Sequence, residues 1–161
     1  MGGILEVYIA NHDDVDSLTI ADGMVKSITM VSANPAPKFK KYLFNPQTGS
    51  LTSTYNIDAA NNVNFVQSDL VLLFGKMDTT KRIEISALAL ADLAVIVKDA
   101  NGTYFYLGKD NPVRATAGDG QTGTARTDGN RYSITLQDNS PEMPYEVLVG
   151  TGGVDLSTII E

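Results

Sequence analysis

One acidic cluster holds the residue types that bind metals. His12, Asp13, Asp14 and Asp16 lie close together, and carboxylates two residues apart in a loop suit a hard cation such as calcium. A calcium loop also needs a glycine for its sharp turn and a glutamate near its end, and the sequence supplies neither. His12 is the only histidine in the chain. We therefore interpret the cluster as an acidic turn in solvent, and we expect no metal.

A glycine pattern offers a second candidate site. Gly118, Gly120 and Gly123 have the spacing G-x-G-x-x-G of dinucleotide-binding loops. That site needs a helix directly after the glycines, because the helix N-terminus holds the pyrophosphate. The sequence that follows, TARTDGN, does not favour a helix. Residues 115–130 contain no large apolar side chain, so we predict a long, exposed glycine loop and no cofactor.

Catalytic groups are scarce. Nucleophilic catalysis needs a base beside a serine, threonine or cysteine, and the chain has no cysteine, one histidine and no G-x-S-x-G motif. Paired carboxylates could cleave glycosidic bonds, but Asp69 is the only carboxylate set in an apolar strand, and we expect it to point outward at a bulge. We predict that the protein is not an enzyme.

Three lysines beside aromatic residues suggest a nucleic-acid strand. Lys38, Lys40 and Lys41 alternate with Phe39 and precede Tyr42, as in proteins that stack single-stranded bases. The formal net charge is −7, which opposes broad affinity for nucleic acid. Lysines that protect an edge strand from unwanted pairing explain this pattern equally well.

The rest of the chain is organised as short strands between turns. The apolar alternation predicts strands at 4–10, 24–31, 38–44, 50–57, 63–75, 93–99, 103–108, 131–137 and 145–150. Residues 11–23 are predicted to be a polar connection with a turn at Asp22-Gly23. Asn101-Gly102 is predicted to form a two-residue type I′ hairpin turn. The predicted fold is mainly β, a β-sandwich or barrel in a single domain at 1–150.

One helix is expected on the flank of this fold, at about 78–91. Asp78 or Thr79 is a suitable N-cap for it. Ile83, Ala87, Leu90 and Ala91 share one helical face, while Ile85 and Leu88 lie on another. This is more apolar surface than a helix packed on one sheet needs.

A C-terminal arm is predicted at 151–161. Four aliphatic residues follow its Thr-Gly-Gly hinge, and such residues either fold back or dock on a neighbour. Arginines also flank the glycine loop, where they can pair with acidic residues of another subunit. The predicted contacts between copies are Ile85, Leu88, Arg114, Arg126, Val154, Leu156, Ile159 and Ile160.

Nothing in the sequence predicts a membrane protein. No apolar run approaches the roughly 20 residues that a membrane helix needs. The N-terminal MGGILEVYIANHDD has no basic region and no cleavage signal, so we do not expect a secretory peptide. A cytoplasmic, soluble protein is the expectation.

Several strings resemble the tail tube, or major tail, proteins of tailed bacteriophages. They are EVYIA, GMVKSITM, the segment from FVQSDLVLLFG to YFYLGKDNPV, and RYSITLQDNSPEMPYEVL. The resemblance covers residues 4–149 and lies in the order of features more than in one motif. It implies a β-sandwich or half-barrel with a flanking helix, six copies of which close into a ring. Stacked rings form a tube, and loops and terminal arms bridge the subunits.

The same resemblance implies the partners and the location. The expected partners are identical copies, other tail proteins, and double-stranded DNA as a non-specific passenger in the lumen. The protein would be assembled in the bacterial cytoplasm and reside in the tail of the virion. Two alternatives stay open: a neck or hub ring or another phage structural protein of related fold, or a small glycan- or peptide-binding β-sandwich.

Overall fold

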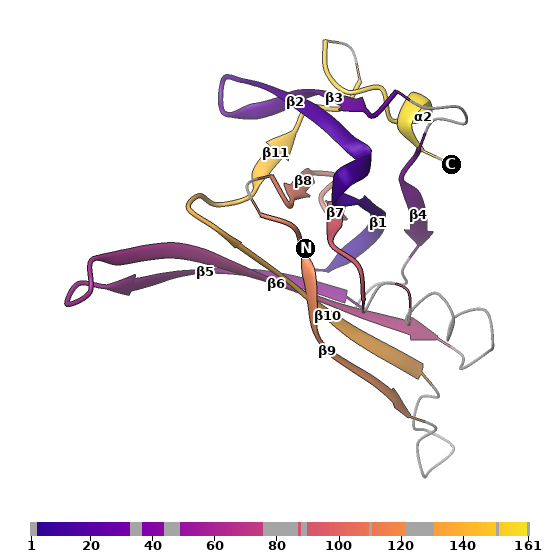
Figure 1. Cartoon of the computed structure of the whole chain (residues 1–161). Coiled ribbons are helices and arrows are strands. Elements are labelled where there is room, and N and C mark those ends of the chain that lie inside the picture. The colour runs from indigo at the N-terminus through magenta and orange to yellow at the C-terminus, as the bar shows by residue number, and fades with distance from the viewer. Residues whose placement is uncertain are drawn as a thin grey trace.

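The computed structural model of the chain is mainly β, with two sheets (Figure 1). It describes residues 3–32, 37–43, 49–75, 87, 90–109, 111–121, 131–150 and 152–160. The strands are β1 Ile4–Asn11, β2 Val15–Ala21, β3 Met24–Met30, β4 Lys40–Leu43, β5 Gly49–Asp58, β6 Val63–Gly75, β7 Leu93–Asp99, β8 Tyr104–Leu107, β9 Arg114–Gln121, β10 Arg131–Ser140 and β11 Tyr145–Val147. Two short helices complete the described elements, the 3-10 helix η1 His12–Asp14 and α2 Leu156–Ile159.

The larger sheet has seven strands in the order β2-β3-β11-β8-β7-β1-β4, and the smaller has four in the order β5-β6-β10-β9. All strand pairs are antiparallel except β11 with β3. The four-stranded sheet is built from two hairpins, β5–β6 and β9–β10, whose inner strands β6 and β10 pair with each other.

A first core fills the space between the two sheets. One face of β1 and β7 meets the inner face of β6 and β10 there, and Leu70, Leu72 and Leu136 are fully buried. Strand β7 crosses the smaller sheet from edge to edge. Its first residue, Leu93, exchanges backbone hydrogen bonds with Val113 beside β9, while Val97 near its other end lies beside Leu51 of β5.

A second core lies on the other face of the seven-stranded sheet. Its strand residues all come from that one sheet. Phe39 and the C-terminal segment complete this core. Strands β1 and β7 are therefore buried on both faces, which explains the nearly continuous apolar sequence LAVIV in β7.

The predicted β-rich fold is confirmed, and most strands lie where the apolar alternation placed them. The prediction at 11–23 was wrong, because Val15–Ala21 forms β2 and pairs with β3. Alternating Val15, Leu18 and Ile20 packs partly against the second core, a signal that the surrounding aspartates obscured. The turn at Asp22-Gly23 is present, with φ of 56° and 74°.

Two further predictions need correction. The 101–102 turn is not type I′, because in this turn only Gly102 has positive φ, 86°. The Asp99 carboxylate accepts from the Asn101 and Thr103 amides, which favours a three-residue loop with a glycine at its left-handed position. The glycine loop is shorter than predicted, since residues 114–121 form β9. Small side chains lower strand propensity, but pairing along β10 satisfies this backbone.

The predicted helix lies almost wholly outside the described residues. Ala87 and Leu90 are helical, and both are exposed.

Candidate functional site

The residues with metal- and nucleotide-binding patterns do not form a site in the described part of the chain. Asp13 and Asp14 lie in η1, and Asp13 is fully exposed beside His12. No cluster of three or more histidine, aspartate or glutamate side chains is arranged for a metal ion among the described residues. Gly118 and Gly120 lie in strand β9, opposite Ile134 and Tyr132 of β10, so they do not precede a helix as a pyrophosphate site requires.

The lysines near β4 make contacts within the chain. Lys41 Nζ lies 3.3 Å from a Glu6 carboxylate oxygen and 5.9 Å from the centre of the Tyr8 ring. Lys98 reaches the other Glu6 oxygen at 3.8 Å. Lys40 lies over the ring of Tyr42. Lys40 and Lys41 belong to β4, an edge strand of the larger sheet, whereas Lys98 belongs to the interior strand β7.

Glu6 is the centre of this charged group. Partial burial raises the pKa of the Glu6 carboxyl, but hydrogen bonds from Tyr8 and Lys41 and the charges of Lys41 and Lys98 outweigh it and hold the pKa below its ordinary value. Burial and the neighbouring carboxylate raise the pKa of Tyr8. The group joins β1, β4 and β7, and it has the features of a structural ion pair.

The predicted contacts between copies fall into three groups. Ile85, Leu88 and Arg126 lie outside the described residues. Arg114 is exposed at the start of β9, where its Nε donates to Asp92 over 2.7 Å. The C-terminal residues Val154, Leu156, Ile159 and Ile160 belong to the second core or pack against it.

Of the two outcomes expected for the C-terminal arm, folding back on its own chain or docking on a neighbour, the structure shows the first. Val154 and Ile159 are only 4% and 6% exposed, buried by their own chain. The arm folds back because Val154 donates to the Leu148 carbonyl and Phe39 donates to that of Ile159. Asp155 caps α2 by accepting from Ser157. Leu156 and Ile160 remain half-buried.

The four-stranded sheet has two open edges in the described part of the chain, β5 and β9. Strand β5 is ten residues long and contains no lysine, arginine or proline. Strand β9 is eight residues long and consists mostly of alanine, glycine and threonine. Monomeric proteins protect such edges with charge, proline or a covering segment. Among the described residues, β5 has no lysine, arginine or proline, and the only charged residues of β9 are Arg114 and Asp119.

The face of this sheet that points away from the core is polar. Thr52, Thr54 and Thr135 lie on it, and the Asp69 carboxylate accepts hydrogen bonds from the side-chain amides of Gln137 at 3.1 Å and Gln67 at 3.2 Å. Asp69 points outward as expected, although the strand has no bulge there. Arg114 lies on this face at the β9 edge, in one row with Gln137, Asp69 and Thr52.

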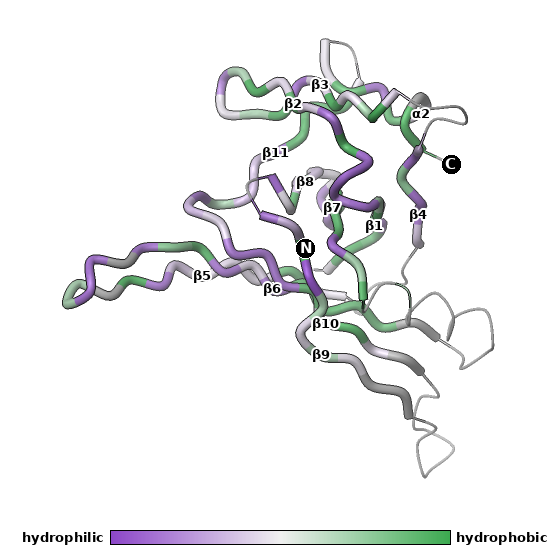
Figure 2. Tube along the Cα trace, viewed as in Figure 1, coloured by the Kyte–Doolittle hydropathy of each residue, from purple (hydrophilic) through white to green (hydrophobic). Residues whose placement is uncertain are grey.

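The β5–β6 hairpin extends beyond the rest of the sheet as a two-stranded arm (Figure 1). The last residue of β6 that pairs with β10, going toward the hairpin tip, is Val66. Residues 56–58 of β5 and 63–65 of β6 therefore pair only with each other. Tyr55 and Ile57 are 56% and 72% exposed on the core-side face of this arm, and hydrophobic stretches continue to its tip (Figure 2). An isolated two-stranded hairpin is marginally stable in water, so this arm is suited to contact another molecule.

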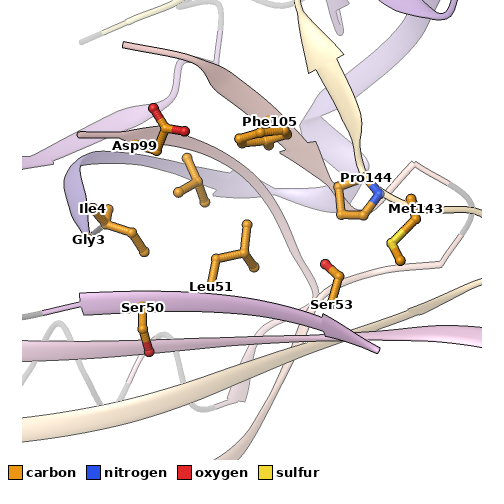
Figure 3. A pocket seen from close by; sticks show the side chains of 10 residues that line it. Gly3, Ile4, Ser50, Leu51, Ser53, Asp99, Phe105, Met143 and Pro144 are labelled. Carbon is orange, nitrogen blue, oxygen red and sulfur yellow. The ribbon is translucent and has the colours of Figure 1, made fainter. Parts of the chain in front are cut away.

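A pocket opens between the sheets beside β5, with a volume of about 460 Å³. Ile4, Leu51 and Phe105 point into it, with Met143 and Pro144 at one side (Figure 3). Its lining is mostly apolar, and Met143 is 38% exposed at its rim. Phe105 faces this pocket, whereas Tyr104 stacks on Tyr8 over the other face of the sheet. The sequence Tyr104-Phe105-Tyr106 therefore does not line one aromatic groove.

Sequence reasoning missed the edges and the pocket. The polar alternation of β5 predicted a strand but not its place at an edge, and the glycines of β9 concealed a strand altogether. The pocket joins residues from five separate parts of the chain, which no local pattern connects.

No protein-family model matches the chain, and neither the curated proteins nor the solved structures contain a match to it. Among its described helices, none has the length and apolar character needed to cross a bilayer.

Proposed function

We propose that the chain is a structural subunit that joins identical copies through the two edges of its four-stranded sheet, as a tail tube subunit of a tailed phage. The observation that carries this proposal is the pair of long edges, β5 and β9, that the described part of the four-stranded sheet leaves without a partner strand. The resemblance of the sequence to tail tube proteins supplies the ring of six copies and the flanking helix at about 78–91.

Strand direction supports such a ring. The four strands alternate in direction, so β5 and β9 run opposite ways. A copy related by rotation about an axis roughly along the strands keeps its direction, and its β9 then meets β5 in antiparallel orientation. Repeating the step gives one continuous antiparallel sheet that closes without an edge.

The chemistry of the outward face suits a lumen through which DNA passes. DNA binding depends on lysine and arginine contacts to phosphates. This face presents threonine and glutamine side chains and the Asp69 carboxylate, and Arg114 at its β9 edge is paired with Asp92. A surface of this kind lets a polyanion pass without holding it. The protein would act without catalysis or cofactor, assembled in the host cytoplasm and carried in the virion tail.

The β5–β6 arm supports contact between successive rings. It extends past the sheet and exposes Tyr55 and Ile57. A neck or hub ring of the same phage class would use the same edges and the same arm. Such a ring would differ from a tail tube ring only in the neighbouring ring on which it stacks.

The strand pairing indicates a test of the junction. Within one chain Thr52 is level with Asp69, Gln137 and Arg114 across the sheet. If β9 of the next copy pairs with β5 and continues this row without a shift in register, its Arg114 lies directly opposite Thr52, on the same face. Thr52 is exposed, but Asp69 lies opposite it within the chain and attracts a lysine or repels a glutamate there, so the thermal midpoint of each dilute variant is the control. A lysine there repels Arg114 of the neighbour and a glutamate attracts it, each by about 0.2–1 kcal/mol.

The experiment compares Thr52→Lys with Thr52→Glu by sedimentation velocity and negative-stain microscopy. We expect rings or tubes from the wild type and from Thr52→Glu, and a lower assembled fraction from Thr52→Lys at low salt. Raised salt should reduce the difference in assembled fraction between Thr52→Glu and Thr52→Lys, because salt screens exposed charges. A wild-type chain that remains monomeric at high concentration would overturn the proposal.

A further inference from the structure

Leu90 is the most exposed of the large hydrophobic residues that the structure describes, at 91%. It lies two residues before Asp92, hence within about 7 Å along the chain. Asp92 pairs with Arg114 at the start of β9. Leu90 therefore lies near the β9 edge of the smaller sheet, three residues before β7 of the larger sheet begins.

The apolar pocket lies at the opposite edge. Leu51 and Ser53 of β5 form one of its walls, and Val97 and Phe105 of the larger sheet form another. One side of the molecule thus exposes an apolar side chain, and the other side has an apolar recess at the same level between the sheets. Such a pair of surfaces makes a head-to-tail contact between copies.

Strand pairing sets the height of the two features. Across the sheet, Leu51 of β5 pairs with Leu70 of β6, and Leu70 pairs with Leu136 of β10. Leu136 in turn pairs with Ala115 of β9, the residue after Arg114. In a junction without stagger, the β9 of the next copy places its Arg114 and Asp92 beside residues 51–53. Its Leu90 then lies at the mouth of the pocket.

We infer that Leu90 of one copy fills the pocket lined by Leu51, Phe105 and Met143 of the next copy. This inference rests on the proposed edge-to-edge assembly and deepens it by naming the apolar contact that accompanies strand pairing. The backbone edges supply the affinity of the junction, and the Leu90 contact selects a second copy of this chain over another exposed strand.

The absence of cysteine allows a direct test by disulfide trapping. The double variant Leu90→Cys/Met143→Cys is oxidised under assembly conditions and run on a denaturing gel. We expect a ladder of covalent oligomers, because each chain carries both halves of the junction. The control pair Leu90→Cys/Val31→Cys places its second thiol at the end of β3, away from the pocket, and should give no products beyond those of Leu90→Cys alone.

A second variant tests the energetics. Leu90→Asp puts a charge at the pocket mouth and should weaken association by about tenfold or more per junction. The control Val31→Asp changes another exposed hydrophobic residue and should leave assembly unchanged. Leu90 contacts solvent in the single chain, so neither its folding nor its thermal midpoint should change.

The outcomes separate the two proposals. Assembly that persists in Leu90→Asp, together with no ladder from Leu90→Cys/Met143→Cys, overturns the pocket contact and leaves edge pairing in place. A ladder of equal strength from the control pair also overturns it, since random collision then accounts for the products. A wild-type chain that does not associate at all overturns both.

Discussion

The C-terminal arm gives the sharpest test of which contacts belong to the single chain. Ile159 is 6% exposed and packs in the second core, whereas Ile57 is 72% exposed on the β5–β6 arm. The same substitution, isoleucine to alanine, therefore removes buried contacts at one site and mostly solvated ones at the other. The pair Ile159→Ala and Ile57→Ala is matched in chemistry and differs in burial.

The expected magnitudes follow from that difference. Truncating a buried isoleucine to alanine costs about 2–5 kcal/mol, depending on how far the site can collapse. Ile159 lies close to the chain end, where neighbours can relax, so we expect about 2–3 kcal/mol. Ile57→Ala loses little burial and some strand propensity, so we expect less than about 1 kcal/mol.

Urea denaturation measures both values. Circular dichroism and tyrosine fluorescence can follow unfolding, because the chain has seven tyrosines and no tryptophan. With a urea slope of about 1–3 kcal/mol/M, Ile159→Ala should lower the midpoint by roughly 1 M or more, equally at every protein concentration. Equal midpoints for the two variants would refute the buried arm. An effect of Ile159→Ala that grows with protein concentration would show that the arm binds a neighbouring copy instead.

Three further predictions concern single sites. Glu6→Gln should lower the free energy of unfolding by about 1–3 kcal/mol near neutral pH, because charged hydrogen bonds are lost. The folded pKa of Glu6 lies below the ordinary 4.5, so the stabilisation by its carboxylate is present above that value and disappears as the pH falls through the folded pKa. The urea midpoints of variant and wild type should therefore converge in acid, and a constant difference between them would contradict this. Gly108→Ala should destabilise more than Gly102→Ala, since both have positive φ but only at Gly108 would a Cβ lie 3.0 Å from the Leu93 carbonyl oxygen; equal thermal midpoints would count against this packing. Ile57→Ser should leave the thermal midpoint nearly unchanged and reduce the length of assembled tubes in micrographs, and tubes of normal length would remove the arm from the stacking contact.

Much of the strand pattern could be predicted because apolar alternation is a local signal. Strands β6 and β7 begin and end at the predicted residues, since their apolar runs are long and bounded by turns. Strand β2 was missed because its apolar residues alternate with polar ones between two acidic turns. Strand β9 was missed because alanine and glycine carry no periodic signal, and its partner β10 supplies the order instead.

The candidate site depends on arrangement more than on residue type. The sequence indicated stranded aliphatic residues at the C-terminus, but only the fold shows that Val154 and Ile159 cover the second core. It also indicated apolar surface beyond the needs of one subunit. Which strands are edges, and which face is polar, follows from the pairing order β5-β6-β10-β9, and pairing across long sequence distances has no local signature.

The central claim is that β5 of one copy pairs with β9 of the next. Hydrogen exchange of the backbone amides, measured for the wild-type chain when dilute and when concentrated, tests it most directly. The outward amides of both strands should exchange quickly in the dilute chain and slowly in the concentrated one, with rings visible in the same sample. Rings whose β5 and β9 amides remain as fast as in the dilute chain would contradict the account.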